Sequence, residues 1–77
     1  MPTALSIHLN GQPRTFDELT SPAILASVIA TLGLKADRVA VEHNKEIVPR
    51  SQWPQVHVAN GDHLEIVHFV GGGITSA

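Results

Sequence analysis

The chain has 77 residues, which is enough for one compact domain and too few for two; 43% are hydrophobic and the formal net charge is −2. This composition is typical of a folded globular protein and excludes a disordered chain. The five Lys and Arg are scattered, which argues against a nucleic-acid ligand, and the absence of cysteine excludes disulfides, thiolate zinc sites and a cysteine nucleophile.

The first predicted element is a β-hairpin. Residues 4–9 alternate between apolar and polar side chains, which predicts a strand with one buried face. The pair Asn10-Gly11 follows, and both residues tolerate the positive φ angles of a tight type I′ turn. Residues 12–16 should return as a second strand. Because Pro13 lacks a backbone donor, we expect this strand at a sheet edge and the first strand at the centre.

A helix is predicted over residues 22–32. Ser21-Pro22 is a favourable helix start, because serine can cap the first turn and proline there needs no hydrogen-bond acceptor. Gly33 supplies the expected end. Apolar residues at helical spacing form one stripe that should pack on a sheet: Leu25, Val28, Ile29 and Leu32.

The second half of the chain predicts further strands. We expect a third strand at residues 38–43, a short strand beside it at 46–48, a loop or single turn at 49–54 and a turn at 60–62. A long final strand should cover residues 63–70. One of its faces should carry Leu64, Ile66, His68 and Val70, and the other Glu65, Val67 and Phe69.

This order of elements predicts an α+β fold in which one helix covers a mixed four- or five-stranded sheet, the β-grasp or ubiquitin-like arrangement. We expect the β-grasp domain at residues 1–70 and a flexible glycine-rich tail at 71–77. The longest apolar stretch, residues 22–32, is too short to span a bilayer, and no signal-peptide pattern begins the chain. We therefore expect a cytoplasmic protein without a membrane partner.

Histidines and carboxylates are the candidate catalytic or metal-binding groups. The five histidines lack helical i, i+4 spacing, so we expect ordinary surface histidines and no metal site, with His68 half-buried on the apolar face. Asp17-Glu18, and Asp62 with Glu65, have no nucleophile nearby, and a domain this small offers little concavity. We expect solvated carboxylates and no catalytic residues.

The run of Gly71, Gly72 and Gly73 directly follows the last predicted strand. No helix follows it, so it does not match a phosphate-binding loop. One interpretation is a disordered end without function. The other is a thin, rotatable segment that threads a narrow channel and delivers a carboxylate to another protein's active site.

Val67 and Phe69 should lie on the face opposite Leu64 and Ile66. Beside the tail, they would form an exposed apolar patch of the kind that protein partners bind. The alternative for Phe69 is a buried position under a loop.

Several motifs together resemble the ThiS family, the sulfur carrier proteins of thiamine biosynthesis, over residues 4–73. They are LEIVHFVGGG at 64–73, Asn10-Gly11, VEHN at 41–44, IVPR at 47–50 and Trp53. The resemblance implies a β-grasp carrier that is not an enzyme and binds no cofactor. It also implies that an E1-like adenylating enzyme uses ATP to activate the Gly73 carboxyl. Sulfur from a cysteine desulfurase relay then converts this carboxyl to a thiocarboxylate, which thiazole synthase consumes.

The sequence departs from the family pattern after Gly73, because residues 74–77 follow where members usually stop. The extension is consistent with a precursor trimmed by a C-terminal peptidase, with artificial lengthening, or with a relative that lost the carrier role. We favour the first two, since the glycines and the preceding strand are intact. The rival functions are a molybdopterin synthase small subunit or another ubiquitin-like modifier, and a protein-interaction module that carries no sulfur.

Overall fold

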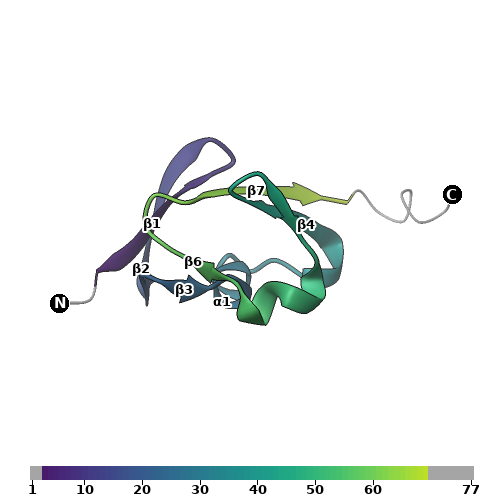
Figure 1. Cartoon of the computed structure of the whole chain (residues 1–77), viewed down its shortest axis with the longest axis horizontal. Coiled ribbons are helices and arrows are strands. Elements are labelled where there is room, and N and C mark those ends of the chain that lie inside the picture. The colour runs from purple at the N-terminus through teal and green to yellow at the C-terminus, as the bar shows by residue number, and fades with distance from the viewer. Residues whose placement is uncertain (1–2, 70–77) are drawn as a thin grey trace, which may run out of the picture.

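In the part of the chain that the structure describes, one five-stranded sheet carries a single α-helix on one face (Figure 1). The computed structural model describes residues 3–69. The elements, in chain order, are β1 (Ala4–Leu9), β2 (Gln12–Thr20), β3 (Ala23–Ile24), α1 (Leu25–Thr31), the 3₁₀ helix η1 (Ala36–Arg38), β4 (Val39–His43), β5 (Glu46–Val48), the 3₁₀ helix η2 (Arg50–Gln55), β6 (His57–Val58) and β7 (His63–His68).

The sheet order is β2-β1-β7-β4-β5, with β1 and β7 parallel and the other neighbours antiparallel. The predicted mixed sheet and the edge position of β2 are therefore confirmed. The expectation that the first strand is central is wrong. The hairpin of β4 and β5 adds to the far side of β7, so β7 lies at the centre and β1 lies second from the edge.

The first hairpin turns at Asn10 and Gly11, whose φ angles of 51° and 81° are both positive, as predicted. The second strand is longer than expected and reaches Thr20 instead of residue 16. Thr20 pairs with Ala4 beyond an irregularity in the register, and such a bulge cannot be recognised from alternation alone.

Helix α1 begins at Leu25 and not at residue 22, so the predicted serine cap is wrong. The Ser21 hydroxyl accepts a hydrogen bond from the Asn60 backbone N–H at 3.0 Å. The next residues form β3, which pairs with β6, and the Leu25 N–H donates to the Val56 carbonyl at 2.8 Å. Tertiary partners thus replace the local cap. The helix ends at Thr31, and Gly33, with a φ of +75°, directly follows the C-cap Leu32 and stops the helix as predicted.

The core lies between α1 and the inner face of the sheet. The helix buries Leu25, Val28 and Ile29, and the sheet contributes apolar side chains at alternate positions, such as Leu64 and Ile66 on β7. Trp53 from η2 closes one side, and its indole N–H donates to the Val48 carbonyl at 3.0 Å. No helix among residues 3–69 is long and apolar enough to cross a membrane. The predicted domain boundary at residue 70 and the tail lie outside the described residues.

Candidate functional site

The end of β7 is the candidate site, because it leads directly into the glycine run. Gly71, Gly72 and Gly73 lie outside the described residues, and Phe69 is the last residue that the structure describes. Its backbone N–H donates to the Arg38 carbonyl at 2.9 Å. Gly73 is four residues further along the chain, so it lies within about 14 Å of this anchor even when the segment is fully extended.

The strand that precedes the tail is held along its length. It pairs with β4 over five register positions, from Val39 with His68 to His43 with Leu64. On its other side, the Asn10 side chain extends the β1 pairing: its carbonyl oxygen accepts from the Ile66 N–H at 2.7 Å and its amide donates to the Ile66 carbonyl at 3.3 Å. These contacts fix the direction in which the chain leaves the sheet.

The face of the sheet opposite α1 carries an apolar patch flanked by carboxylates. Val67 is 60% exposed and pairs with Ala40 on β4, while Ile47 on β5 is 74% exposed. Register places Glu42 between Ile47 and Glu65, so these side chains form a row beside the Val67 pair. We call this surface the outer sheet face, formed by Ala40, Glu42, Ile47, Glu65 and Val67.

The exposure predicted for three residues near the end of β7 is confirmed for one of them and not for the other two. Val67 is exposed, as the alternation indicated. Phe69 lies beyond the end of β7 and is partly buried, and it lines a hollow beside the loop after α1 instead of joining Val67 on the outer sheet face. His68 was expected to be half-buried, but it is exposed and lines the same hollow. Phe69 follows the last residue of β7, so alternation does not determine its environment. His68 is the last residue of the strand, pairs with Val39, and lies at the margin of the core, where the hollow leaves it exposed.

The sequence analysis missed Ile47, Glu42 and the hollow. Ile47 lies in a strand of three residues, which is too short to show a period-two pattern. Its position beside Glu42 depends on the pairing register between β4 and β5, which the sequence does not specify. The only available signal was an isolated isoleucine between a glutamate and a valine.

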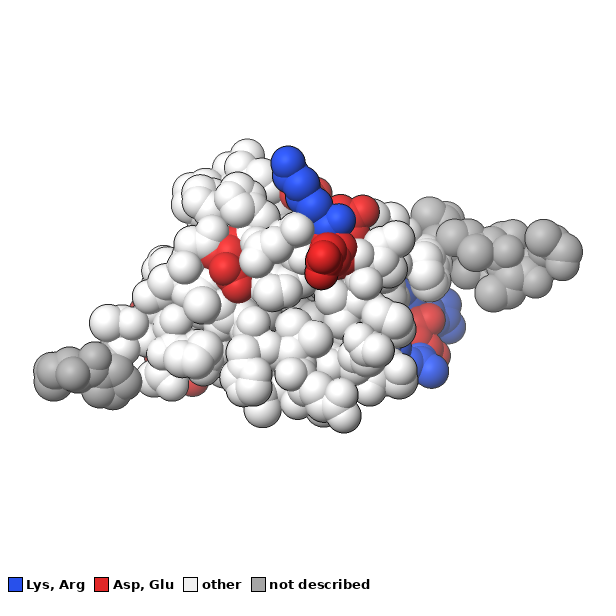
Figure 2. All heavy atoms as spheres, viewed as in Figure 1, with Lys and Arg blue, Asp and Glu red and all other residues white. Residues whose placement is uncertain are grey.

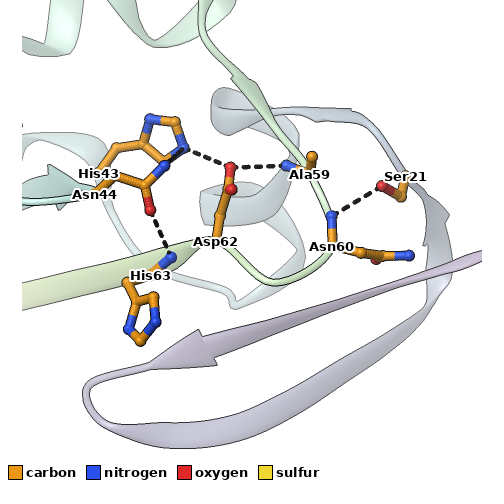
Figure 3. A network of polar contacts seen from close by, with 7 residues as sticks. All are labelled: Ser21, His43, Asn44, Ala59, Asn60, Asp62 and His63. Atoms are coloured by element: carbon orange, nitrogen blue, oxygen red, sulfur yellow. Dashed lines mark hydrogen bonds and ion pairs between the residues drawn. The ribbon is translucent and has the colours of Figure 1, made fainter.

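Asp62 belongs to a polar cluster at the turn before β7 (Figure 3). Its Oδ2 accepts from the Ala59 N–H at 2.9 Å and contacts His43 Nε2 at 2.7 Å, so the expectation of a solvated carboxylate is wrong for Asp62. Beside it, the Asn44 side chain accepts from the His63 N–H at 2.9 Å. Partial burial raises the pKa of Asp62, but the hydrogen bonds from Ala59, His43 and Asn44 outweigh it, and the pKa lies below its usual value.

This cluster holds the turn in place, and it presents no nucleophile. His8 and His63, on the paired strands β1 and β7, stack with their ring centroids 4.5 Å apart. Within residues 3–69 no three His, Asp or Glu side chains come together as a metal ion would require. The chemistry available at this end of the molecule is therefore that of the tail and of the surfaces around it.

Comparisons with known proteins agree on one family. The sequence model of the ThiS family matches residues 7–73. The sulfur carrier protein ThiS of Bacillus subtilis (strain 168) is 36% identical over 67 residues, which are 87% of this chain and 98% of that protein. A crystal structure of the thiamine biosynthesis protein ThiS from Geobacter metallireducens has a TM-score of 0.76 and 30% identity, and covers 90% of this chain and 100% of that one.

Two further relatives are longer proteins. The thiazole synthases of Paramagnetospirillum magneticum and Magnetococcus marinus are 41% and 39% identical over 95% and 90% of this chain. The matched regions are only 22% and 20% of those proteins. The chain thus spans about a fifth of their length.

Proposed function

The chain belongs to the ThiS family, and we propose that it is a sulfur carrier protein of thiamine biosynthesis whose reactive group is the carboxyl of Gly73. The observation that carries this proposal is the family match, which runs through the fold and ends at Gly73, the last of the three glycines. The family's Bacillus subtilis member is named a carrier, so the chain acts as a protein substrate and not as an enzyme.

Adenylation makes the chemistry possible. A carboxylate is a poor electrophile, and its attack on the α-phosphate of ATP, with release of pyrophosphate, gives an acyl-adenylate with a phosphate leaving group. An E1-like adenylating enzyme binds the ATP, and a cysteine desulfurase relay provides sulfur as a protein persulfide. The outer persulfide sulfur attacks the acyl carbon and AMP leaves, which gives an acyl disulfide. A thiol reductant then cleaves the S–S bond, and a thiocarboxylate remains on Gly73.

The tail must be narrow and must end at Gly73. Gly71 and Gly72 carry no side chains, so they can pass through a thin channel in the partner. Ile74 is β-branched and bulky, and the peptide bond after Gly73 leaves no carboxylate to activate. The proposal therefore includes cleavage between Gly73 and Ile74, by a C-terminal peptidase or an equivalent step.

The outer sheet face is the proposed docking surface for the adenylating enzyme and for thiazole synthase. Val67 and Ile47 offer exposed apolar area on this face, and Val67 lies near the end of β7; Phe69, which lines the neighbouring hollow, is a separate candidate contact. Thiazole synthase as the sulfur acceptor is supported by the two relatives of that name, each of which includes a region similar to this chain.

Intact-mass spectrometry tests the proposal directly. Chains 1–73 and 1–77 are incubated with ATP, the adenylating enzyme and a sulfur donor. Chain 1–73 retains all the described residues and should gain about 16 Da as sulfur replaces oxygen, whereas chain 1–77 should not change. The mechanism would be refuted if both chains formed the thiocarboxylate equally well, or if chain 1–73 formed none.

A further inference from the structure

A shallow hollow of about 420 Å³ lies where β7 ends. The turn after α1, the 3₁₀ helix η1 and the last residues of β7 form it. We call it the cationic hollow, and its lining residues are Gly33, Leu34, Lys35, Arg38, His68 and Phe69. Figure 2 shows Lys and Arg atoms at this end of the molecule, with acidic atoms among them.

The cationic hollow is lined by positively charged residues, although the chain as a whole has a negative net charge. It contains two of the five Lys and Arg of a chain whose net charge is −2, together with an exposed imidazole. Within residues 3–69 the only ion pair is His43 with Asp62, so no described carboxylate lies within 4.0 Å of Lys35 or Arg38. Asp37 separates them in sequence but does not line the hollow. These cations are thus available to an external anion.

Arg38 also links the cationic hollow to the tail, because its carbonyl accepts from the Phe69 N–H. An enzyme that holds the Gly73 carboxyl must have that site within about 14 Å of this anchor, so the hollow lies within reach of its surface. Covering Lys and Arg without supplying acceptors would leave desolvated, unpaired charges, which is costly. The complementary surface must carry carboxylates, whose oxygens match the guanidinium and ammonium donors.

We propose that the cationic hollow is a binding site for Asp or Glu side chains of the adenylating enzyme, at the rim of the channel that receives the tail. This inference rests on the proposed function. The outer sheet face carries Glu42 and Glu65, with Lys45 close to Glu65, and so lacks the cationic character of the hollow. This difference in charge between the two surfaces favours one orientation of the carrier on a complementary enzyme.

The test measures binding of chain 1–73 to the adenylating enzyme from the same organism, at 50 mM and 500 mM NaCl. The double variant Lys35→Glu/Arg38→Glu should bind at least about tenfold more weakly at low salt. The difference should shrink at high salt, where screening is stronger. The control is the single charge reversal Arg50→Glu, because Arg50 is also exposed and does not line the hollow; the affinity of this variant should stay within about twofold of wild type.

Circular dichroism checks that each variant is folded, and Lys35→Gln/Arg38→Gln replaces the double reversal if that variant unfolds. The cationic hollow would be excluded as a binding site if the folded double variants bound the adenylating enzyme as tightly as the wild type does. The same conclusion would follow if Arg50→Glu lost as much affinity as they do. The proposed function would survive this result if chain 1–73 still acquires the thiocarboxylate. If wild-type chain 1–73 never acquires the thiocarboxylate, the proposed function fails, and the inference fails with it.

Discussion

Replacing Asp62 with alanine tests whether the turn before β7 is held by its carboxylate. Asp62 Oδ2 takes part in two contacts, with the Ala59 N–H at 2.9 Å and with His43 at 2.7 Å. A hydrogen bond to a charged group contributes about 1.5–3 kcal/mol, but the Ala59 contact is exposed, and water can replace it. We therefore expect Asp62→Ala to lower the free energy of unfolding by about 1–2 kcal/mol at pH 7. For a domain of this size that is a fall in Tm of about 4–16 °C.

The effect should depend on pH with a definite sign. The pKa of Asp62 is lower in the folded state, so its ionisation stabilises the fold above the unfolded-state pKa near 3.9. This stabilisation is lost as the pH falls through the folded-state value. The difference between wild type and Asp62→Ala should therefore be largest at pH 7 and smaller at about pH 2.5.

Urea unfolding, monitored by circular dichroism, measures the loss of unfolding free energy at each pH. The control variant is Asp17→Ala. Asp17 is an exposed carboxylate on β2, so its removal should change stability by less than about 0.5 kcal/mol. A loss below about 0.5 kcal/mol for Asp62→Ala, or the same loss at both pH values, would refute the assigned role of the carboxylate.

Two further predictions concern the core and the docking surface. Leu25 is fully buried, so Leu25→Ala should cost about 2–5 kcal/mol in chemical unfolding; a cost below about 0.5 kcal/mol would place Leu25 outside the core. Val67→Ser and Phe69→Ala should each weaken binding of the adenylating enzyme and of thiazole synthase by about fivefold or more, measured by calorimetry, without unfolding the domain. The control Ile24→Ala, at an exposed apolar residue on β3, should leave both affinities unchanged; an unchanged affinity for Val67→Ser would exclude the outer sheet face, and one for Phe69→Ala would exclude Phe69 as a contact.

The elements that the sequence predicted correctly are those set by local chemistry. Alternation identified β1, β4 and β7, and the two faces of β7 followed from the same pattern as far as Val67. The hairpin at Asn10-Gly11 and the helix end at Gly33 followed from positive φ angles, which glycine and asparagine tolerate. Each of these depends on a few neighbouring residues.

The errors arise where a distant partner determines the outcome. Ser21 is a good local cap, but its hydroxyl contacts Asn60, which is 39 residues away in sequence, and the first N–H of α1 is taken by Val56. The centre of the sheet depends on how β4 and β5 attach to β7, which alternation cannot show. The cationic hollow likewise forms from segments about 30 residues apart, so its lining could not be read from local sequence.

The contacts around β7 hold in place the strand that leads into the glycine run. Under the proposed function, the direction in which Gly73 is presented depends on this strand. That strand is paired on both sides, held at Ile66 by the Asn10 side chain and preceded by a turn that Asp62 fixes. A strand fixed in this way loses little conformational entropy when a partner docks. Under the proposed function, the fold supplies the position of the Gly73 carboxyl, and the partner enzymes supply the chemistry.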